Sequence, residues 1–143
     1  MFIANLTDRG AGPALASMLA FTEARQRVIA ENVANLGVPG YRTQSLDTAE
    51  FQRALRRALD ERGADPNRPF RIGRTDEVES RADGTLKVTP SRVPQNILAH
   101  DGTDASIERQ MQDLAETAMM HQAVTTLLQG RFESFRKAIR GQA

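Results

Sequence analysis

Few side chains in this sequence are of the types that carry out acid–base, nucleophilic or metal chemistry. The two histidines are His100, which stands beside Asp101, and His121, which follows Glu116 by five residues. Neither pair supplies the three or four ligands of a usual metal site. The chain has no cysteine, which excludes disulfides, thiolate ligands and thiol nucleophiles. We therefore expect a loop histidine at His100 and a helix-seam histidine at His121, with no metal and no other cofactor.

The hydroxyl and glycine motifs do not indicate catalysis either. Ser45, Ser91, Ser106 and Ser134 do not lie in a nucleophile-elbow sequence. The stretch Gly10-Ala11-Gly12 precedes a predicted helix, but it follows no strand and lacks the Lys-Ser/Thr pair of a phosphate-binding loop. The sequence therefore predicts a protein that is not an enzyme.

The charges are nearly balanced, with a formal net charge of +1 and only 5% aromatic residues. The middle of the chain contains a basic run: Arg53, Arg56, Arg57, Arg62, Arg68, Arg71 and Arg74. Acidic residues are interleaved with it: Asp60, Glu61, Asp65, Asp76, Glu77 and Glu79. A nucleic-acid-binding surface normally shows a clear basic excess. The balance argues against binding to nucleic acid, and salt bridges to a neighbouring subunit fit the same run equally well.

The hydropathy pattern predicts neither a membrane-spanning helix nor a cleaved leader. No stretch approaches the roughly 18 consecutive apolar residues that a membrane helix needs. The first residues, Met1 to Leu6, lack a basic segment and a long apolar run. We expect a chain that stays in the cytoplasm or leaves it by a route that needs no such signal, without direct membrane insertion.

The N-terminal part predicts a helix over residues 13–36. Pro13 suits the first helical position, and Gly37 and Pro39 end the pattern. Positions recur at spacings of four and three: Leu15, Leu19, Thr22, Gln26, Ile29, Val33 and Leu36. Met18, Phe21 and Val28 lie off this stripe. A second apolar strip indicates that the helix makes contacts on more than one side.

The C-terminal part predicts a longer helix over residues 104–140, capped by Thr103 or Asp104. Its four-three series is typical of a coiled coil: Ile107, Met111, Leu114, Ala118, His121, Thr125, Leu128, Phe132, Phe135 and Ile139. Such a helix would be about 55 Å long. A compact domain of 143 residues cannot bury it along its whole length, so we expect other chains to cover part of it.

Between the long helices the pattern weakens. Asp47 and Glu50 form a capping-box start for a short helix at 47–61, with Phe51, Leu55 and Leu59 on its apolar edge. Residues 62–96 have too few apolar positions for a core of their own, and we expect this variable segment to be the most mobile part of the free chain. Asp83-Gly84, between 78–81 and 85–88, is a hairpin signal.

These patterns predict a mainly α fold, in which residues 1–143 form one subunit. The long N- and C-terminal helices would pair as an antiparallel coiled coil. The middle would contribute the short helix and an irregular or small β-hairpin segment.

The segment from Ala30 to Tyr41 closely resembles the signature of the axial proteins of the bacterial flagellum, the rod and hook family. In that family a helix ends in Ala-Asn-x-x-Asn before a Thr-Pro-Gly-Tyr-like turn. The matching positions here are Asn32, Asn35, Pro39, Gly40 and Tyr41, with Val38 in place of the usual Thr. The amides can satisfy backbone groups near a helix end, Pro39-Gly40 favours a turn, and Tyr41 can bury its ring while its hydroxyl stays in water.

The C-terminal half resembles the proximal rod proteins of that family. The match runs through Asn96 to Gly102, then Asp104, Ile107, Glu108, Met111 and Leu114 to Glu116, and ends with Phe132, Phe135, Arg136, Ala138 and Ile139. The resemblance covers roughly residues 13–60 and 95–140, and the middle segment departs from it. The chain is too short to contain the long inserted domains of hook and distal-rod proteins.

The resemblance implies a structural subunit of the proximal rod in the periplasmic space. Such a subunit assembles helically, transmits torque and connects the export apparatus and MS ring to the distal rod and hook. The implied partners are copies of the chain, other rod proteins (FlgC, FlgF and a FliE-like adaptor) and the flagellar type III export apparatus, which needs no cleaved signal. The packing residues would be those of the two helical stripes: Leu15, Leu19, Ile29, Val33, Leu36, Ile107, Met111, Leu114, Leu128, Phe132, Phe135 and Ile139.

The sequence leaves two hypotheses open, one about export and one about function. Phe51 and Leu55 fit the Phe-x-x-x-apolar motif of early export substrates, but any amphipathic helix offers such a pair. A soluble helical adaptor or chaperone-like module would use the same apolar stripes to bind a single partner.

Overall fold

The computed structural model describes residues 11–63, 65, 68–93 and 103–141. For residues 103–106 it describes the backbone only. It is mainly helical. The elements in chain order are α2 (Gly12–Asn35), β1 (Gln44–Ser45), α3 (Thr48–Arg62), β2 (Val78–Ser80), β3 (Leu86–Val88), β4 (Ser91–Arg92) and α4 (Thr103–Ile139). Each helix begins within one residue of the position that periodicity and capping indicate.

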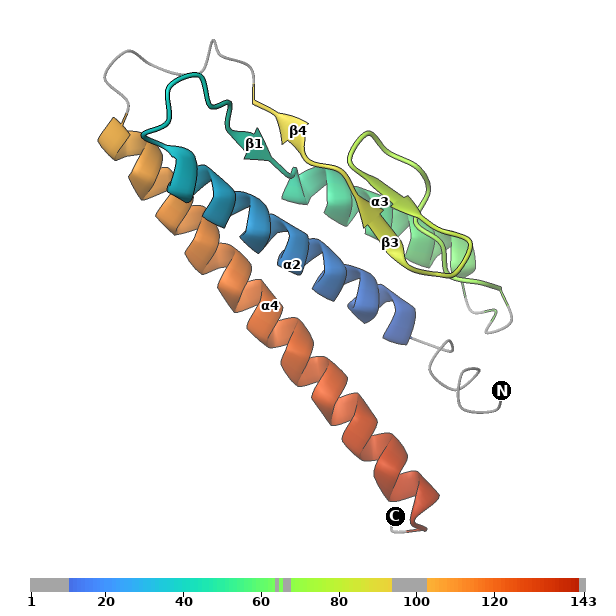
Figure 1. The fold of residues 1–143 in the computed structure, drawn as a ribbon. Helices are drawn as coiled ribbons and strands as arrows, with labels where there is room; N and C mark the ends of the chain where they lie inside the picture. Colours follow the sequence, from blue (N-terminus) through green and yellow to red (C-terminus); the bar gives the residue numbers. More distant parts are fainter. Residues whose placement is uncertain (1–10, 64, 66–67, 94–102, 142–143) are drawn as a thin grey trace.

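Helix α2 is the central element of the fold (Figure 1). Helix α4 lies along one side of it, and α3 and the strands lie along the other. Three side-chain hydrogen bonds join α2 to α4: Thr22 with His121, Arg25 with Asp113, and Asn32 with Gln110. As the residue number rises along α2, the number of its partner in α4 falls. The two long helices therefore run in opposite directions.

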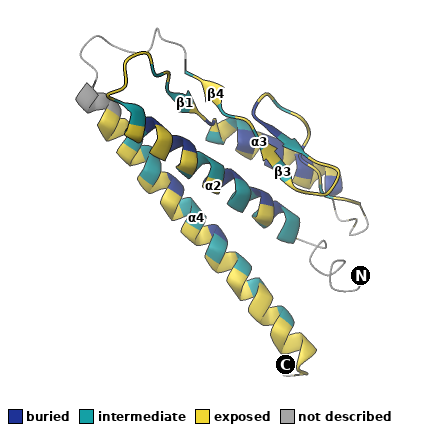
Figure 2. Ribbon diagram, in the orientation of Figure 1, coloured by how far each residue is buried: buried dark blue, intermediate teal, exposed yellow. Residues whose placement is uncertain are grey.

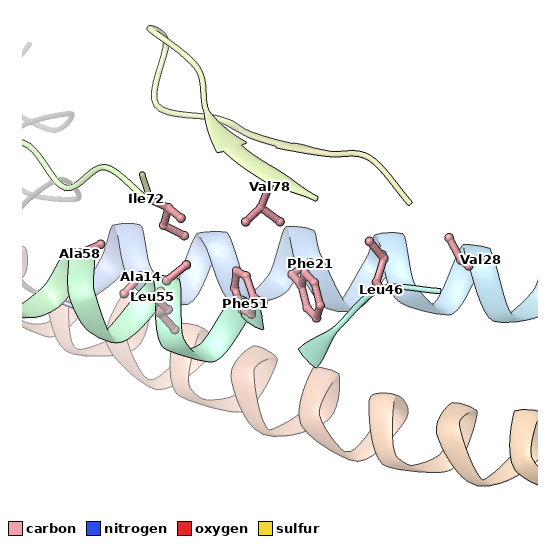
Figure 3. Packing of buried hydrophobic residues seen from close by; sticks show 10 residues of the cluster. Ala14, Phe21, Val28, Leu46, Phe51, Leu55, Ala58, Ile72 and Val78 are labelled. Carbon is pink, nitrogen blue, oxygen red and sulfur yellow. The ribbon is translucent and has the colours of Figure 1, made fainter. Parts of the chain in front are cut away.

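The hydrophobic core lies between α2, α3 and the strand segments (Figure 3). Ala14, Phe21 and Val28 of α2 stand at heptad spacing and face it. Phe21 stacks on Phe51 of α3, with ring centroids 4.0 Å apart and planes 2° from parallel. The strip of α2 that includes Phe21 and Val28 thus packs against α3 and the strand segments. None of the buried residues in this cluster comes from α4.

Helix α3 begins as its capping residue predicts. The Asp47 carboxylate accepts from the backbone N–H of Ala49 (2.8 Å) and of Glu50 (3.0 Å). The helix ends at Gly63, whose φ of 56° is a conformation that favours glycine. Phe51, Ala54, Leu55 and Ala58 give α3 one buried face.

The hairpin predicted in the middle segment is present. β2 and β3 pair antiparallel with Val78 opposite Val88, and Gly84 at the turn has a φ of 84°. The segment contributes Ile72 and Val78 to the core on α2 and α3, where they are each 2% exposed. It therefore needs no core of its own. A second strand pair, β1 with β4, was not expected from the sequence.

Helix α4 leaves much of its surface uncovered (Figure 2). It has 37 residues where α2 has 24, and it continues past the start of α2. Its outward face and its C-terminal turns are exposed. Thr117 and Val124 are buried, and because α4 packs on α2 we infer that both lie in that contact. No helix in the described part of the chain is both long enough and apolar enough to cross a membrane.

Candidate assembly surfaces and the signature turn

The signature turn follows the end of α2 directly. The N–H of Tyr41 donates to the carbonyl of Val38 over 3.1 Å, which closes a four-residue turn around Pro39 and Gly40. Gly40 has a φ of 80°, which matches the third position of a type II turn after proline. A side chain at that position would be strained, so Gly40 is required by the backbone rather than by any contact.

Asn32 connects three parts of the molecule. It is 1% exposed, and its amide NH₂ donates to the carbonyl of Gln44 (2.7 Å) and to the side-chain oxygen of Gln110 in α4 (3.2 Å). Its carbonyl oxygen accepts from the Gln44 N–H (3.0 Å) and from the Tyr41 hydroxyl (3.1 Å). Every group of this amide thus has a partner, and the amide joins α2, the turn, β1 and α4.

The Asn32 amide pairs with the backbone groups of Gln44 that β4 does not reach. The bond from the Val93 N–H to the Thr43 carbonyl shows that the next pair, Gln44 and Arg92, is a non-hydrogen-bonded one. The backbone N–H and C=O of Gln44 therefore point away from β4, and Asn32 takes both of them. The amide occupies the place that a third strand would fill.

The other signature positions have smaller roles in this chain. Asn35 donates to the Glu31 carbonyl (2.7 Å) at an exposed site, which is a local bond at the helix end. Tyr41 is only half-buried, and its hydroxyl donates to Asn32 instead of remaining solely in water. Pro39 is exposed in the turn. Val38 is 50% exposed, so the position where the family usually has Thr faces solvent.

Several polar side chains lie in the contact between α2 and α4. Arg25 reaches Asp113 at 3.3 Å and Glu116 at 4.0 Å. The Thr22 hydroxyl donates to the Leu19 carbonyl (2.9 Å), so its oxygen is left to accept from Nδ1 of His121 at 3.1 Å. That geometry assigns the proton to Nδ1, because a hydroxyl has only one hydrogen to give. His121 therefore lies in the contact between α2 and α4, as the helical spacing predicts.

The predicted packing residues of α2 divide between faces. Ile29 is 4% exposed, while Leu15, Leu19, Val33 and Leu36 are half-buried. The most deeply buried apolar side chain of α2 is Phe21, which the four-three stripe does not include. Its heptad spacing to Ala14 and Val28 is the sequence signal for this second face.

The predicted packing residues of α4 lie beside its contact with α2. Leu114, Leu128 and Phe135 are half-buried. Four others are exposed: Ile107 (37%), Met111 (47%), Phe132 (54%) and Ile139 (77%). The residues that α2 buries most completely are Thr117 and Val124. At about 100° per residue, the predicted series lies about 60° around the helix from that line. An apolar strip therefore flanks the contact with α2, and its exposed residues have no partner among the described residues.

Phe51 and Leu55 are 2% and 8% exposed and belong to the core. Their spacing fully serves the packing of α3 on α2. In the folded chain neither side chain is available to a partner.

The buried carboxylate of Glu77 was not singled out by the sequence pattern. It is 6% exposed, and its two oxygens accept from the Asp47 N–H (2.7 Å) and the Ser91 hydroxyl (2.6 Å). Glu77 thus connects the hairpin segment to the start of α3 and to β4. No local pattern marks it, because it stands among exposed charges in the sequence.

No group of three or more metal-binding side chains comes together within the described ranges. His100 and the family-like stretch from Asn96 to Gly102 lie outside the described residues, as do the side chains of Thr103 and Asp104 that could cap α4.

A long exposed helix with an unpartnered apolar strip is typical of a subunit in a protein assembly. No protein-family model matches the chain. The chain is 31% identical over 114 residues to a protein of Borrelia hermsii that is named flagellar basal body rod protein FlgB. The match spans 77% of this chain and 81% of that protein. The chain belongs to the FlgB family of flagellar basal-body rod proteins.

Proposed function

We propose that the chain is a structural, non-enzymatic subunit of the proximal rod. It assembles helically with copies of itself and with other rod proteins, FlgC, FlgF and a FliE-like adaptor among them. The rod transmits torque and joins the export apparatus and MS ring to the distal rod and hook. The observation that supports this most is the exposed apolar strip of α4 in a chain of the FlgB family.

The same proposal assigns a role to each long helix. α2 and α4 pair as an antiparallel coiled coil, and the exposed strip of α4 contacts neighbouring subunits. A head-to-tail contact between copies generates an open helix when its rotation does not close. Within this strip Phe132 and Ile139 are the strongest positions for such a contact, because they are its most exposed large apolar side chains.

Complementation of a deletion strain tests this function. The deletion should stop basal-body assembly after the inner-membrane ring, as seen by electron microscopy of purified basal bodies. Phe132→Glu should fail to restore the rod while the monomer keeps its helical content, since Phe132 is 54% exposed. Gln112→Glu, which adds the same charge at another exposed position of α4, is the matched control. Complete rods in the deletion strain would refute the proposal and favour a soluble adaptor.

Export through the flagellar type III apparatus is a further part of the proposal. Because Phe51 and Leu55 are buried, the apparatus would contact them only while the chain is unfolded. Phe51→Ala and Leu55→Ala should lower the amount of chain exported to the periplasm. Leu59→Ala, at a 42% exposed position of the same helix, should not. Equal export of all three variants would exclude this motif as a signal.

A further inference from the structure

A shallow hollow lies beside the signature turn, next to the β1–β4 pair. It has a volume of about 370 Å³ and is lined by Gly40, Tyr41, Arg42, Gln44 and Arg92. The family signature accounts for Gly40 and Tyr41 as turn residues. It does not account for the two arginines, and the coiled-coil proposal does not use them.

The strand register explains why these side chains meet. Gln44 stands directly opposite Arg92, so their side chains share one face of the pair. Arg42 precedes Gln44 by two positions, and side chains two apart in an extended segment point the same way. Gly40 has no side chain to fill the hollow, and its Cβ position has no neighbour within 4 Å.

The positive charges on this face have no acidic residue beside them in the hollow. Arg42 and Arg92 are both exposed, and neither forms an ion pair within the described part of the chain. No acidic residue lines the hollow. Arg25, in contrast, lies beside Asp113 and Glu116. Like charges at neighbouring cross-strand positions repel each other, and an anion between them would remove that cost.

We propose that this hollow binds a carboxylate side chain of a neighbouring protein subunit. The inference rests on the proposed function, because it requires the chain to be packed in an assembly. A guanidinium matches a carboxylate through two parallel hydrogen bonds, and Gln44 adds an amide donor. Arginine and tyrosine are also the residues that protein interfaces favour.

A phosphate-rich ligand fits the hollow less well. Surfaces that bind anionic lipid usually gather four to eight basic residues, whereas this hollow has two. The formal net charge of +1 gives no general attraction to a polyanion. The two arginines suit one acidic side chain on a protein surface.

The test uses the double variant Arg42→Glu/Arg92→Glu in the deletion strain. We expect at least a tenfold loss of completed rods and of swimming cells, since an interface charge pair is replaced by a repulsion. Arg71→Glu/Arg74→Glu is the matched control, because it changes the net charge equally at two exposed positions away from the hollow. Arg42→Lys/Arg92→Lys should retain part of the assembly, since lysine keeps the charge but not the planar fork.

The outcomes separate this inference from the proposed function. A deletion strain that builds rods refutes the function itself. A deletion that blocks the rod, together with full rescue by the double glutamate variant, refutes only the carboxylate site. Equal damage by the control pair would show an effect of bulk charge and overturn the proposal. Loss of the purified variant's cooperative melting would do the same, because it would give the arginines a structural role.

Two further measurements identify the ligand. An acidic-to-basic substitution in a rod subunit that restores assembly to the double variant would support a protein carboxylate. Vesicles containing phosphatidylglycerol, mixed with the purified chain, test the membrane alternative. Binding to these vesicles that needs Arg42 and Arg92, with rod assembly unaffected, would overturn the proposal.

Discussion

Replacement of Asn32 by alanine should destabilise the monomer far more than the same change at Asn35, although both asparagines belong to the family signature. The Asn32 amide is 1% exposed and has bonds to Gln44, Tyr41 and Gln110. Asn35 makes one local bond at an exposed site. Comparing the two variants therefore distinguishes the effect of a buried side-chain amide from that of an exposed amide at the helix end.

The magnitude follows from the groups that lose partners. In Asn32→Ala the backbone N–H and C=O of Gln44 lose their bonds of 3.0 and 2.7 Å. An unsatisfied group with restricted access to water costs about 1–3 kcal/mol. Tyr41 and Gln110 are half-buried and can turn to water. We expect a loss of about 2–4 kcal/mol for Asn32→Ala. Asn35→Ala should stay within about 0.5 kcal/mol of the parent chain.

Urea denaturation of the purified monomer, followed by circular dichroism at 222 nm, measures both changes. The two variants share the gain in helix propensity that alanine brings, which makes each a control for the other. A loss below about 1 kcal/mol for Asn32→Ala, or equal losses for the two variants, would refute the argument that the amide replaces a missing strand.

Three further changes test other parts of the fold. Phe51→Ala removes the ring stacked 4.0 Å from Phe21 and should cost about 3–5 kcal/mol in chemical denaturation; a loss near 1 kcal/mol would show that this core is loosely packed. Gly130→Ala should stabilise α4 by about 1 kcal/mol, because a Cβ there meets nothing within 4 Å; slower amide exchange in α4 is the readout, and unchanged exchange would contradict it. The hydrogen bonds that Asp83 accepts from the Thr85 hydroxyl and N–H lower the pKa of its carboxyl from the ordinary value of 3.8. Their contribution to stability is therefore present above that value and is lost as the pH falls through the lowered pKa. Thr85→Val should raise the Asp83 pKa toward its ordinary value in an NMR titration, whereas an unchanged pKa would assign the shift to other groups.

Much of the local structure could be predicted from the sequence. Periodicity predicts α2 and α4, Asp47 predicts the start of α3, and Asp83-Gly84 predicts the hairpin. These signals act over a few residues, through capping, turn geometry and side-chain spacing. The sequence also indicates that α2 has two apolar faces, because Phe21 and Val28 lie off its main stripe.

The functional surfaces were less predictable for a physical reason. A heptad pattern shows that a helix has an apolar stripe, but the line that becomes buried depends on which element packs there and at what rotation. In α4 that line runs through Thr117 and Val124. Phe132 lies beside that line, and Ile139 lies in the C-terminal turns, where α4 continues past the start of α2, so both are exposed.

The sequence by itself determined the helices, their caps and turns, and the family signature. Only the tertiary structure decided that Asn32 completes a strand pair, that Glu77 is buried, and that Arg42 and Arg92 share a face. The reason is that each of these depends on residues far apart in the chain. Arg42 and Arg92 meet only because β1 and β4 pair in one register, and no local preference encodes that pairing.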